Sequence, residues 1–175
     1  FDILVIRQLI HCLNQLADHK NIKFLIAGHG NKMPSVRQAA ERLPNVRICD
    51  FLRGTAFEHA VAASSCGIVS LEKGLTGMCA PSKYYSYLQG GLPILAIAEQ
   101  SSYLSKEALH SEIGLCSDVG NGVQLTQNIL QLYQDPELCE KLSGNAVRLY
   151  TEKYAKGIGL NKYATLFKNV LRTAN

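Results

Sequence analysis

Short apolar runs alternate with amphipathic stretches along this chain of 175 residues. The amphipathic stretches carry apolar residues three and four positions apart, which is typical of helices, whereas the short runs have the length and composition of strands. The alternation predicts an α/β fold, a Rossmann-like doubly wound parallel sheet whose apolar strands are covered by helices on both faces. The runs that we expect to form its strands are Ile22–Gly28, Val46–Asp50, Cys66–Leu71, Pro93–Ala98 and Ile113–Ser117.

Three helix starts are predicted from residues that act locally on the backbone. Pro34 suits the first turn of a helix, where its missing N–H is not needed. Thr55 followed by Glu58 fits a capping box, in which each side chain bonds a backbone N–H near the helix start. Asp135 followed by Pro136 is a start signal of the same kind.

The length of the chain predicts a single domain over residues 1–175. We expect a terminal helix over about 157–173 that packs back across this domain. The first stretch, residues 1–20, has apolar residues at helical spacing and lacks the basic region and cleavage site of a signal peptide, so it predicts a helix. The longest apolar runs fall far short of the roughly 20 residues that a membrane span needs.

Composition narrows the classes of partner. Six cysteines are spread along the chain with no C-x-x-C pair and no histidine cluster at ligand spacing, so we expect no metal site. Free cysteines in apolar segments indicate a reducing, cytoplasmic setting. The formal net charge is +4 with Lys and Arg scattered along the chain, so nucleic acid is not expected, although a slightly basic surface suits an anionic substrate.

The first candidate loop, Ala27–Lys32, follows the first predicted strand. Ligands of such folds bind at the edge where parallel strands end, and Gly28 and Gly30 let the backbone approach a ligand closely. The pattern is only G-x-G, however, and a tight turn between strand and helix explains it equally well. His29 stands between the two glycines without a visible carboxylate partner, which favours an incidental loop residue.

The second candidate loop lies within Glu72–Pro93, where Pro81-Ser82-Lys83 precedes a short helix that stops at a Gly-Gly pair. We expect Ser82 to be the N-cap of this helix. A helix amino terminus offers N–H groups and a partial positive charge, and Lys83 adds a full charge, so a phosphate can be held here. The alternative is an ordinary serine cap beside a solvated lysine. No G-x-x-x-x-G-K-[ST] pattern is present, which argues against P-loop phosphoryl transfer.

The order of these segments, from FLIAGHG through CGIVSL and APSKYYSYLQGGLPILA to EIGLCSDVGNG, is similar to the carboxy-terminal, donor-binding domain of GT-B glycosyltransferases of family 4. The similarity covers nearly the whole chain from about Ile22 onward. Its most specific stretch, P-S-K-x-Y-x-Y-L-x-x-G-x-P, resembles enzymes that build bacterial capsular and extracellular polysaccharides.

The resemblance implies that the chain binds a nucleotide sugar, with its diphosphate between the glycine loop and the short helix, and needs neither a metal nor another cofactor. Lys83 and Lys32 would stabilise the diphosphate leaving group electrostatically. The base would lie against Phe51 and Leu52. The implied donor-binding residues are Gly28, Gly30, Lys32, Phe51, Leu52, Pro81, Ser82, Lys83, Ser101 and Ser102; no catalytic residue is implied.

The sequence departs from the family at the Glu-x7-Glu pattern, whose second Glu binds the ribose. Met78 and Ser86 occupy the two places here, and neither is acidic. Because neither place is acidic, the resemblance implies no ribose contact in this chain. Glu72 is the nearest acidic residue that could replace the second Glu of the pattern.

The resemblance implies a transferase of hexosyl type that moves a sugar from a nucleotide sugar to a saccharide or lipid-linked acceptor with retention of configuration. Family members work in the cleft between two lobes, and this chain corresponds to one of them. We therefore expect the acceptor-binding, amino-terminal lobe to be a partner outside this chain, the isolated domain to be inactive without it, and any peripheral association with a membrane to go through it.

Two other functions remain open. A sugar-nucleotide epimerase-like relative shares the diphosphate crevice but needs carboxylates for proton transfer, and the strand-end loops offer few. A non-catalytic Rossmann-like module for binding or interaction is the alternative from a different class.

Overall fold

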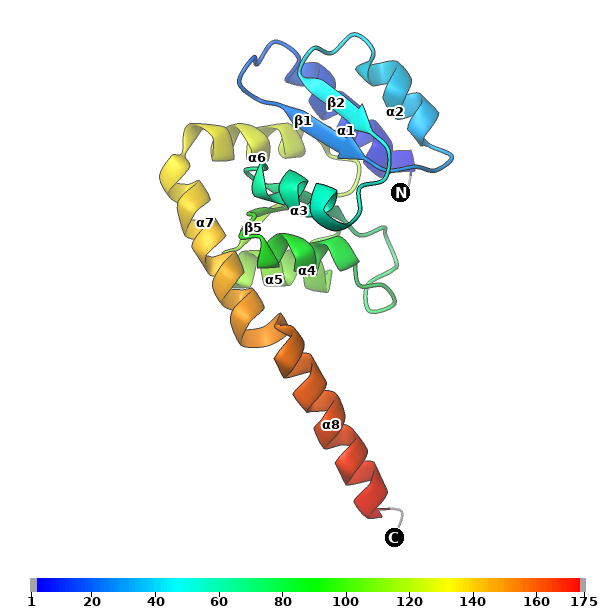
Figure 1. The fold of residues 1–175 in the computed structure, drawn as a ribbon. Helices are drawn as coiled ribbons and strands as arrows, with labels where there is room; N and C mark the ends of the chain where they lie inside the picture. The colour runs from blue at the N-terminus through cyan, green and yellow to red at the C-terminus, as the bar shows by residue number, and fades with distance from the viewer. Residues whose placement is uncertain (1–2, 174–175) are drawn as a thin grey trace.

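Every strand expected from the sequence forms, and strands alternate with helices along the chain (Figure 1). The computed structural model describes residues 3–173. All strand pairings are parallel: β1 with β2, β3 with β4 and β4 with β5. The strands are β1 (Phe24–Ala27), β2 (Val46–Cys49), β3 (Gly67–Ser70), β4 (Ile94–Ile97) and β5 (Gly114–Ser117).

The α/β, Rossmann-like fold class is confirmed, but the strands form a two-stranded and a three-stranded sheet instead of one hydrogen-bonded sheet. The expected burial on both faces holds in full only for β4, every residue of which is buried. Leu25 of β1 is 48% exposed and Arg47 of β2 is exposed, so the first two strands have an open face. The apolar run FLIA of β1 resembles ILAI of β4, and composition alone therefore did not separate the two environments.

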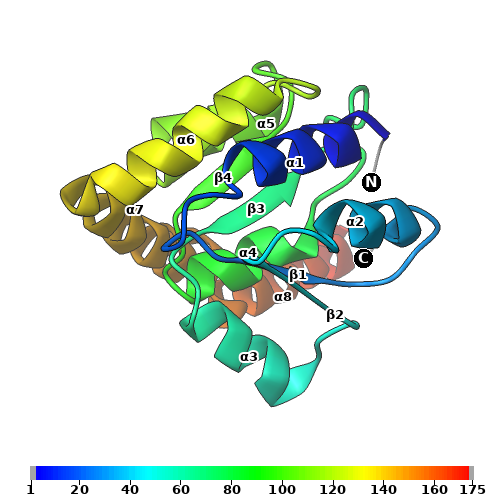
Figure 2. The ribbon, with the colours of Figure 1, turned by 90° about the horizontal axis from the view of Figure 1, so that it is seen from above.

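Helices lie on both faces of the three-stranded sheet, as a doubly wound fold requires (Figure 2). The covering helices are α1 (Ile3–Gln15) and α6 (Gly122–Gln134) on one face and α4 (Ser82–Gln89) and α5 (Tyr103–His110) on the other. The other helices before η1 are α2 (Met33–Ala40), which contacts β2 and α1, α3 (Gly54–Ala62) and α7 (Pro136–Leu149). Successive side chains of a strand point to opposite faces, and β4 follows this rule. Leu95 and Ile97 join a buried cluster with α1 and α6, whereas Ile94 and Ala96 join a second cluster with α4 and α5.

A buried amide, that of Gln8 in α1, ties this helix to the loop after β5. The side chain is 2% exposed, and its Nε2 donates to Ser117 Oγ at 3.0 Å and to the Asn121 carbonyl at 3.1 Å. Its Oε1 accepts the Gly120 N–H at 2.8 Å. Because these bonds satisfy the amide, its burial costs little, and α1 fixes the loop at the carboxyl end of β5.

Two of the three predicted helix starts are confirmed. Pro34 lies in the first turn of α2, and the Asp135 carboxylate accepts the Leu138 N–H at 2.9 Å at the start of α7. The capping box at Thr55 is wrong, because α3 begins one residue earlier, at Gly54, after an Arg53 N-cap that makes no side-chain cap bond. Gly54 has a φ of +53°, which turns the chain into the helix before the threonine is reached.

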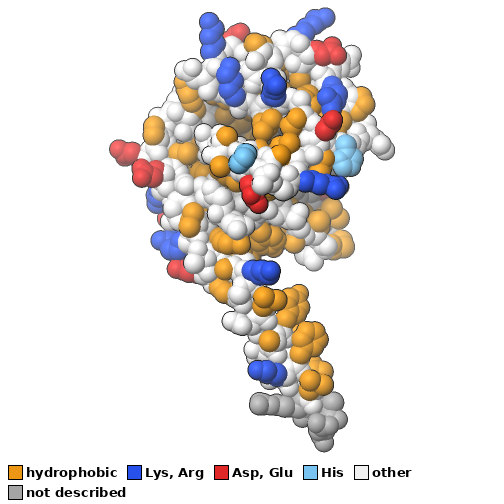
Figure 3. Space-filling model, viewed as in Figure 1, with side chains coloured by type: hydrophobic (Ala, Val, Ile, Leu, Met, Phe, Trp, Pro, Cys, Tyr) orange, Lys and Arg blue, Asp and Glu red, His pale blue; other side chains and the backbone are white. Residues whose placement is uncertain are grey.

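The terminal helix forms, as α8 (Lys156–Thr173), but it does not pack back as expected (Figure 1). A π-helical turn, η1 (Tyr150–Tyr154), follows α7, and Ala155 is extended, so α8 leaves the body in a new direction. Leu160, Tyr163 and Phe167 are 58%, 65% and 64% exposed, and Figure 3 shows apolar side chains running along one side of α8. Among residues 3–173, none of the helices combines the length and apolar character of a membrane span.

The closest approach between β4 and β5 generates a stability prediction. A Cβ built on Gly114 would clash with the Ile94 carbonyl oxygen. We expect Gly114→Ala to lower the free energy of unfolding by about 3 kcal/mol or more, because the two strands must separate to admit the methyl group. Urea unfolding followed by circular dichroism measures the change.

Gly144→Ala is the matched control, since a Cβ at Gly144 in α7 would meet no atom within 4 Å. Alanine is the better helix former, so this variant should gain about 0.5–1 kcal/mol. Similar unfolding midpoints for the two variants would contradict the parallel register of β4 and β5.

Candidate functional site

The carboxyl ends of the strands carry the candidate site. Because the paired strands are parallel, the loops that follow β3, β4 and β5 share one edge of their sheet, and those that follow β1 and β2 share the edge of theirs. These loops are residues 28–32, 50–53, 71–81, 98–102 and 118–121.

The glycine loop after β1 leaves its backbone open to an approaching group. Gly28 and Gly30 have φ of +154° and +135°, and a Cβ on either would meet no atom within 4 Å. Both the tight turn and the ligand loop expected from the sequence need this geometry. Lys32, at the end of the loop, is exposed and is the N-cap residue of α2.

Phe51 in the loop after β2 forms an exposed aromatic platform beside the glycine loop. Its ring is 48% exposed and meets the His29 ring edge-on, with 5.5 Å between centroids. The Arg53 guanidinium lies 5.0 Å from the Phe51 centroid, within cation–π range. Leu52, the other residue expected to contact a base, is partly buried. The loops after β1 and β2 therefore meet, as the sequence interpretation required.

The long loop after β3 is hydrogen-bonded to residues that follow β4 in the sequence. Gly74 and Gly77 have φ of +76° and +82°, so the loop makes two turns that favour glycine. The Glu99 carboxylate accepts the Gly74 N–H at 3.4 Å, and the Tyr103 hydroxyl donates to the Cys79 carbonyl at 3.3 Å.

The start of α4 differs from the sequence prediction by one residue. Pro81 is the N-cap residue, and Ser82 is the first residue of the helix, without a side-chain cap bond. Proline holds its φ at −64° and takes an extended ψ of 114°, so the helix cannot include it and begins directly afterwards. Ser82 and Lys83 are exposed in the first turn, whereas Tyr84 is fully buried.

The serine pair after β4 separates into two roles. Ser102 is 1% exposed and caps α5, its Oγ accepting the Ser105 N–H at 3.1 Å. Ser101 is exposed at the edge of the sheet. A contact between a ligand and either serine stays a prediction, and the cap already occupies the Ser102 hydroxyl.

The sequence interpretation underestimated the carboxylates at this edge. Glu72, Glu99 and Asp118 follow β3, β4 and β5 within two residues of each strand end. Glu99 is bonded to Gly74, and Asp118 accepts a hydrogen bond from Gln100 at 3.4 Å. Their positions directly after apolar runs were a usable signal, because a strand prediction places the next polar residue at the carboxyl edge.

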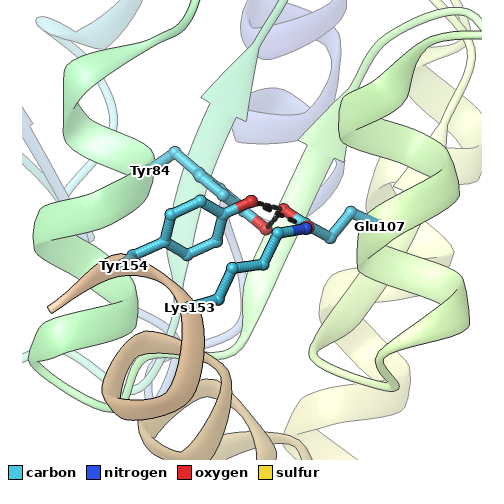
Figure 4. A network of polar contacts seen from close by, with 4 residues as sticks. All are labelled: Tyr84, Glu107, Lys153 and Tyr154. Carbon is cyan, nitrogen blue, oxygen red and sulfur yellow. Dashed lines mark hydrogen bonds and ion pairs between the residues drawn. The ribbon is translucent and has the colours of Figure 1, made fainter. Parts of the chain in front are cut away.

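Next to α4, a mostly buried carboxylate joins three elements (Figure 4). Glu107 of α5 accepts the Tyr84 hydroxyl of α4 at 2.6 Å and the Tyr154 hydroxyl of η1 at 2.8 and 2.7 Å to its two oxygens. Lys153 of η1 forms an ion pair with the same carboxylate. We call these four residues the Glu107 clasp.

The clasp shifts the ionisation of its members. Burial opposes ionisation of Glu107, but the hydrogen bonds from Lys153, Tyr84 and Tyr154 outweigh it and lower the pKa of the carboxyl. Burial and the bonds to Glu107 raise the pKa of Tyr84 and of Tyr154 above the ordinary phenol value. At neutral pH the shifted groups of the clasp are therefore a carboxylate and two neutral phenols.

The cysteines fit the description of free, mostly covered thiols. Burial raises the pKa of Cys12 to about 11 and that of Cys66 to about 12, so neither is a reactive thiolate at neutral pH. Residues 3–173 contain no group of three or more His, Cys, Asp or Glu side chains arranged to hold a metal ion.

One curated relative resembles most of the chain. The probable glycosyltransferase WbjE of Pseudomonas aeruginosa is 27% identical over 163 residues, which is 90% of this chain and 39% of WbjE. No family model matches the sequence.

Solved structures share the fold. A glycosyltransferase from Rickettsia africae superposes over 98% of this chain and 45% of its own with a TM-score of 0.78 and 15% identity. WaaG, a glycosyltransferase involved in lipopolysaccharide biosynthesis, covers 86% of this chain and 40% of its own with a TM-score of 0.66 and 17% identity. A UDP-GlcNAc 2-epimerase from Neisseria meningitidis covers 85% and 39% with a TM-score of 0.57 and 17% identity.

These comparisons confirm the resemblance to glycosyltransferases of the GT-B fold. The chain spans less than half the length of each of these proteins. Assignment to family 4 and to polysaccharide-building enzymes of the capsular type stays a prediction.

The clasp generates a prediction about pH. We expect Glu107→Gln to lower the free energy of unfolding at pH 7 by about 1.5–3 kcal/mol, because it weakens bonds to a buried charge. The folded-state pKa of Glu107 is lowered. Its contribution is therefore complete above the unfolded value of about 4.3 and disappears as pH falls through the folded value. In denaturant titrations, the difference in unfolding free energy between variant and wild type should shrink as the pH falls from about 5 to about 3.

Glu112→Gln is the control, because the Lys141–Glu112 ion pair is 56% and 59% exposed at its two side chains. Its loss should change stability by no more than about 0.5 kcal/mol. A Glu107→Gln variant as stable as this control at pH 7 would show that the clasp contributes nothing.

Proposed function

We propose that the chain is the donor-binding domain of a glycosyltransferase that transfers a sugar, of hexosyl type, from a nucleotide sugar to a saccharide or lipid-linked acceptor with retention of configuration. The observation that carries the proposal is the start of α4. Ser82 and Lys83 are exposed in its first turn, at the carboxyl end of β3, on a helix whose next residue, Tyr84, is fully buried. A cationic side chain thus stands on a firmly packed helix start.

The electrostatics of the α4 start and of the glycine-loop region favour a diphosphate. The first turn of a helix carries N–H groups without intrahelical partners and a partial positive charge, and Lys83 adds a full one. Residues 18–53, which include the glycine loop, contain seven Lys or Arg and three Asp or Glu residues. Figure 3 shows Lys and Arg side chains over the part of the molecule formed by β1, β2 and α2. A basic surface concentrates an anionic donor.

In the proposed reaction the bond from the anomeric carbon to the diphosphate oxygen breaks, a bond from that carbon to the acceptor oxygen forms, and the proton of the acceptor hydroxyl passes to the departing diphosphate. Negative charge then develops on the diphosphate. Lys83, Lys32 and the backbone N–H groups of the first turn of α4 stabilise this charge in the proposal, so no metal is required.

The proposed binding surface for the nucleotide base is the exposed aromatic platform of Phe51. Its ring is exposed, and Arg53 and His29 flank it, which suits stacking of a planar heterocycle with a hydrogen-bonding rim. Leu52, Pro81 and Ser101 complete the proposed donor contacts.

The acceptor belongs to a second lobe in this proposal, because the chain spans 39% to 45% of the related proteins. The isolated domain then binds donor without transferring the sugar. Any peripheral contact with a membrane is assigned to that lobe, and the free thiols fit a cytoplasmic location.

An epimerase-like activity is the alternative that an observation favours. The UDP-GlcNAc 2-epimerase shares the fold, and Glu72, Glu99 and Asp118 supply carboxylates at the right edge for proton transfer. Incubation with UDP-N-acetylglucosamine and no acceptor distinguishes the two, since an inverted carbon centre seen by NMR supports the epimerase. A non-catalytic module predicts neither chemistry.

Calorimetric titration with UDP, GDP, ADP and their sugar conjugates tests the proposal. We expect one diphosphate to bind selectively and Lys83→Ala to weaken its binding by about 1–3 kcal/mol, the range for a charge-assisted hydrogen bond. Lys20→Ala is the control, because this exposed lysine precedes β1 and lies toward the opposite end of the strand. Unchanged affinity in a folded Lys83→Ala protein would contradict diphosphate binding at the start of α4.

A further inference from the structure

The Glu107 clasp is not used by the proposed donor site, although one of its members belongs to the helix that carries Lys83. Tyr84 follows Lys83 directly and is 0% exposed, and its hydroxyl bonds Glu107 at 2.6 Å. Lys153 and Tyr154 reach the same carboxylate from η1, and Tyr154 lies 70 residues after Tyr84 in the sequence. Figure 4 shows the Tyr84 and Tyr154 side chains converging on the carboxylate from α4 and η1.

The position of α4 depends on such contacts. The helix has eight residues and no side-chain cap at its start, and a helix of two turns is marginal without tertiary packing. The aromatic rings supply that packing: the Tyr154 centroid lies 4.9 Å from that of Tyr85 and 6.2 Å from that of Tyr84, both edge-on. The first turn of α4 is therefore held from below by η1 and Glu107.

η1 is a place where this support can change. A π-helical turn is an irregularity within a helix and is frequent at functional sites. Here it joins α7 to α8, and Ala155 at its end is extended. The direction of α8 and the position of the Tyr154 side chain therefore depend on the same few residues. A displacement of α8 that unwinds η1 also withdraws Lys153 and Tyr154 from Glu107.

We propose that Glu107 is a positioning residue for the donor site: through Tyr84 and Tyr154 it holds the first turn of α4, and with it Lys83, in the place where a nucleoside diphosphate binds. The inference rests on the proposed function. Release of the clasp at η1 lowers donor affinity without removing any residue that touches the donor, so the state of the α7–α8 junction reports on the site.

The test is a double-mutant cycle on the full chain, read by calorimetry with whichever of UDP, GDP and ADP the wild type binds. We expect Tyr154→Phe to weaken binding about threefold to tenfold, which is less than the full loss of a hydrogen bond to a charged group because Lys83 is displaced and not removed. In a Lys83→Ala background the same change should have no further effect, because the clasp acts through that lysine. Tyr163→Phe, on exposed α8, removes the same hydroxyl away from the clasp and should leave affinity unchanged.

Lys153→Met provides a second variant if Tyr154→Phe fails to fold, since the Lys153 side chain is 51% exposed, and Lys162→Met is its control. Unchanged affinity in the folded clasp variants, or an equal loss with and without Lys83, would overturn the positioning role. Wild type that binds no diphosphate sinks the donor assignment itself, so the two failures are told apart by the first titration.

Discussion

β4 is buried along its whole length, and its side chains alternate between two helical layers. Leu95 and Ile97 are covered by one layer, and Ile94 and Ala96 by the other, so both faces of the three-stranded sheet depend on the same four residues. The parallel register on either side of β4 then brings the loops after three strands to one edge. Burial of apolar surface thus determines where the strand-end loops lie, and with them the candidate site.

The edge itself is organised by polar contacts of a different kind. Gln8 fixes the loop after β5, and Glu99 and Tyr103 hold the loop after β3. Below that edge, Glu107 joins α4, α5 and η1 through a charge that is 12% exposed. A charge that is mostly removed from water destabilises the fold unless several hydrogen bonds compensate it. Removal of one bonding partner therefore leaves the charge less compensated. Glu107 therefore connects the π-helical turn η1 to the helix start that carries Lys83.

The sequence predicted the fold well because apolar runs and helix periodicity report burial, which dominates this structure. The five strands were predicted in this way. The helix starts at Pro34 and Asp135 were predicted from local capping signals, and the GT-B resemblance came from the order of the segments and the P-S-K stretch. The exact first residues of two helices could not be predicted. Gly54 and Pro81 shifted these helix starts away from Thr55 and Ser82, because backbone geometry outweighed the capping preference of the side chain.

Long-range polar pairings were also beyond the sequence. Glu107 and Tyr154 have no spacing that links them, and the direction of α8 depends on one π-helical turn. The candidate residues of the glycine loop and the α4 start were found because glycines and a P-S-K start are local signals. Glu99 and Asp118 were missed although each follows a predicted strand.

A donor site that spans the glycine loop and the start of α4 is tested most directly by two-dimensional amide NMR spectra of the protein titrated with UDP, GDP or ADP. We expect one of these diphosphates to perturb the backbone amides of Gly28–Lys32 together with those of Ser82 and Lys83, while the amide signals near Lys20 and Gln131 do not shift. Perturbations confined to those distant amides, or none with any of the three diphosphates, would contradict such a site.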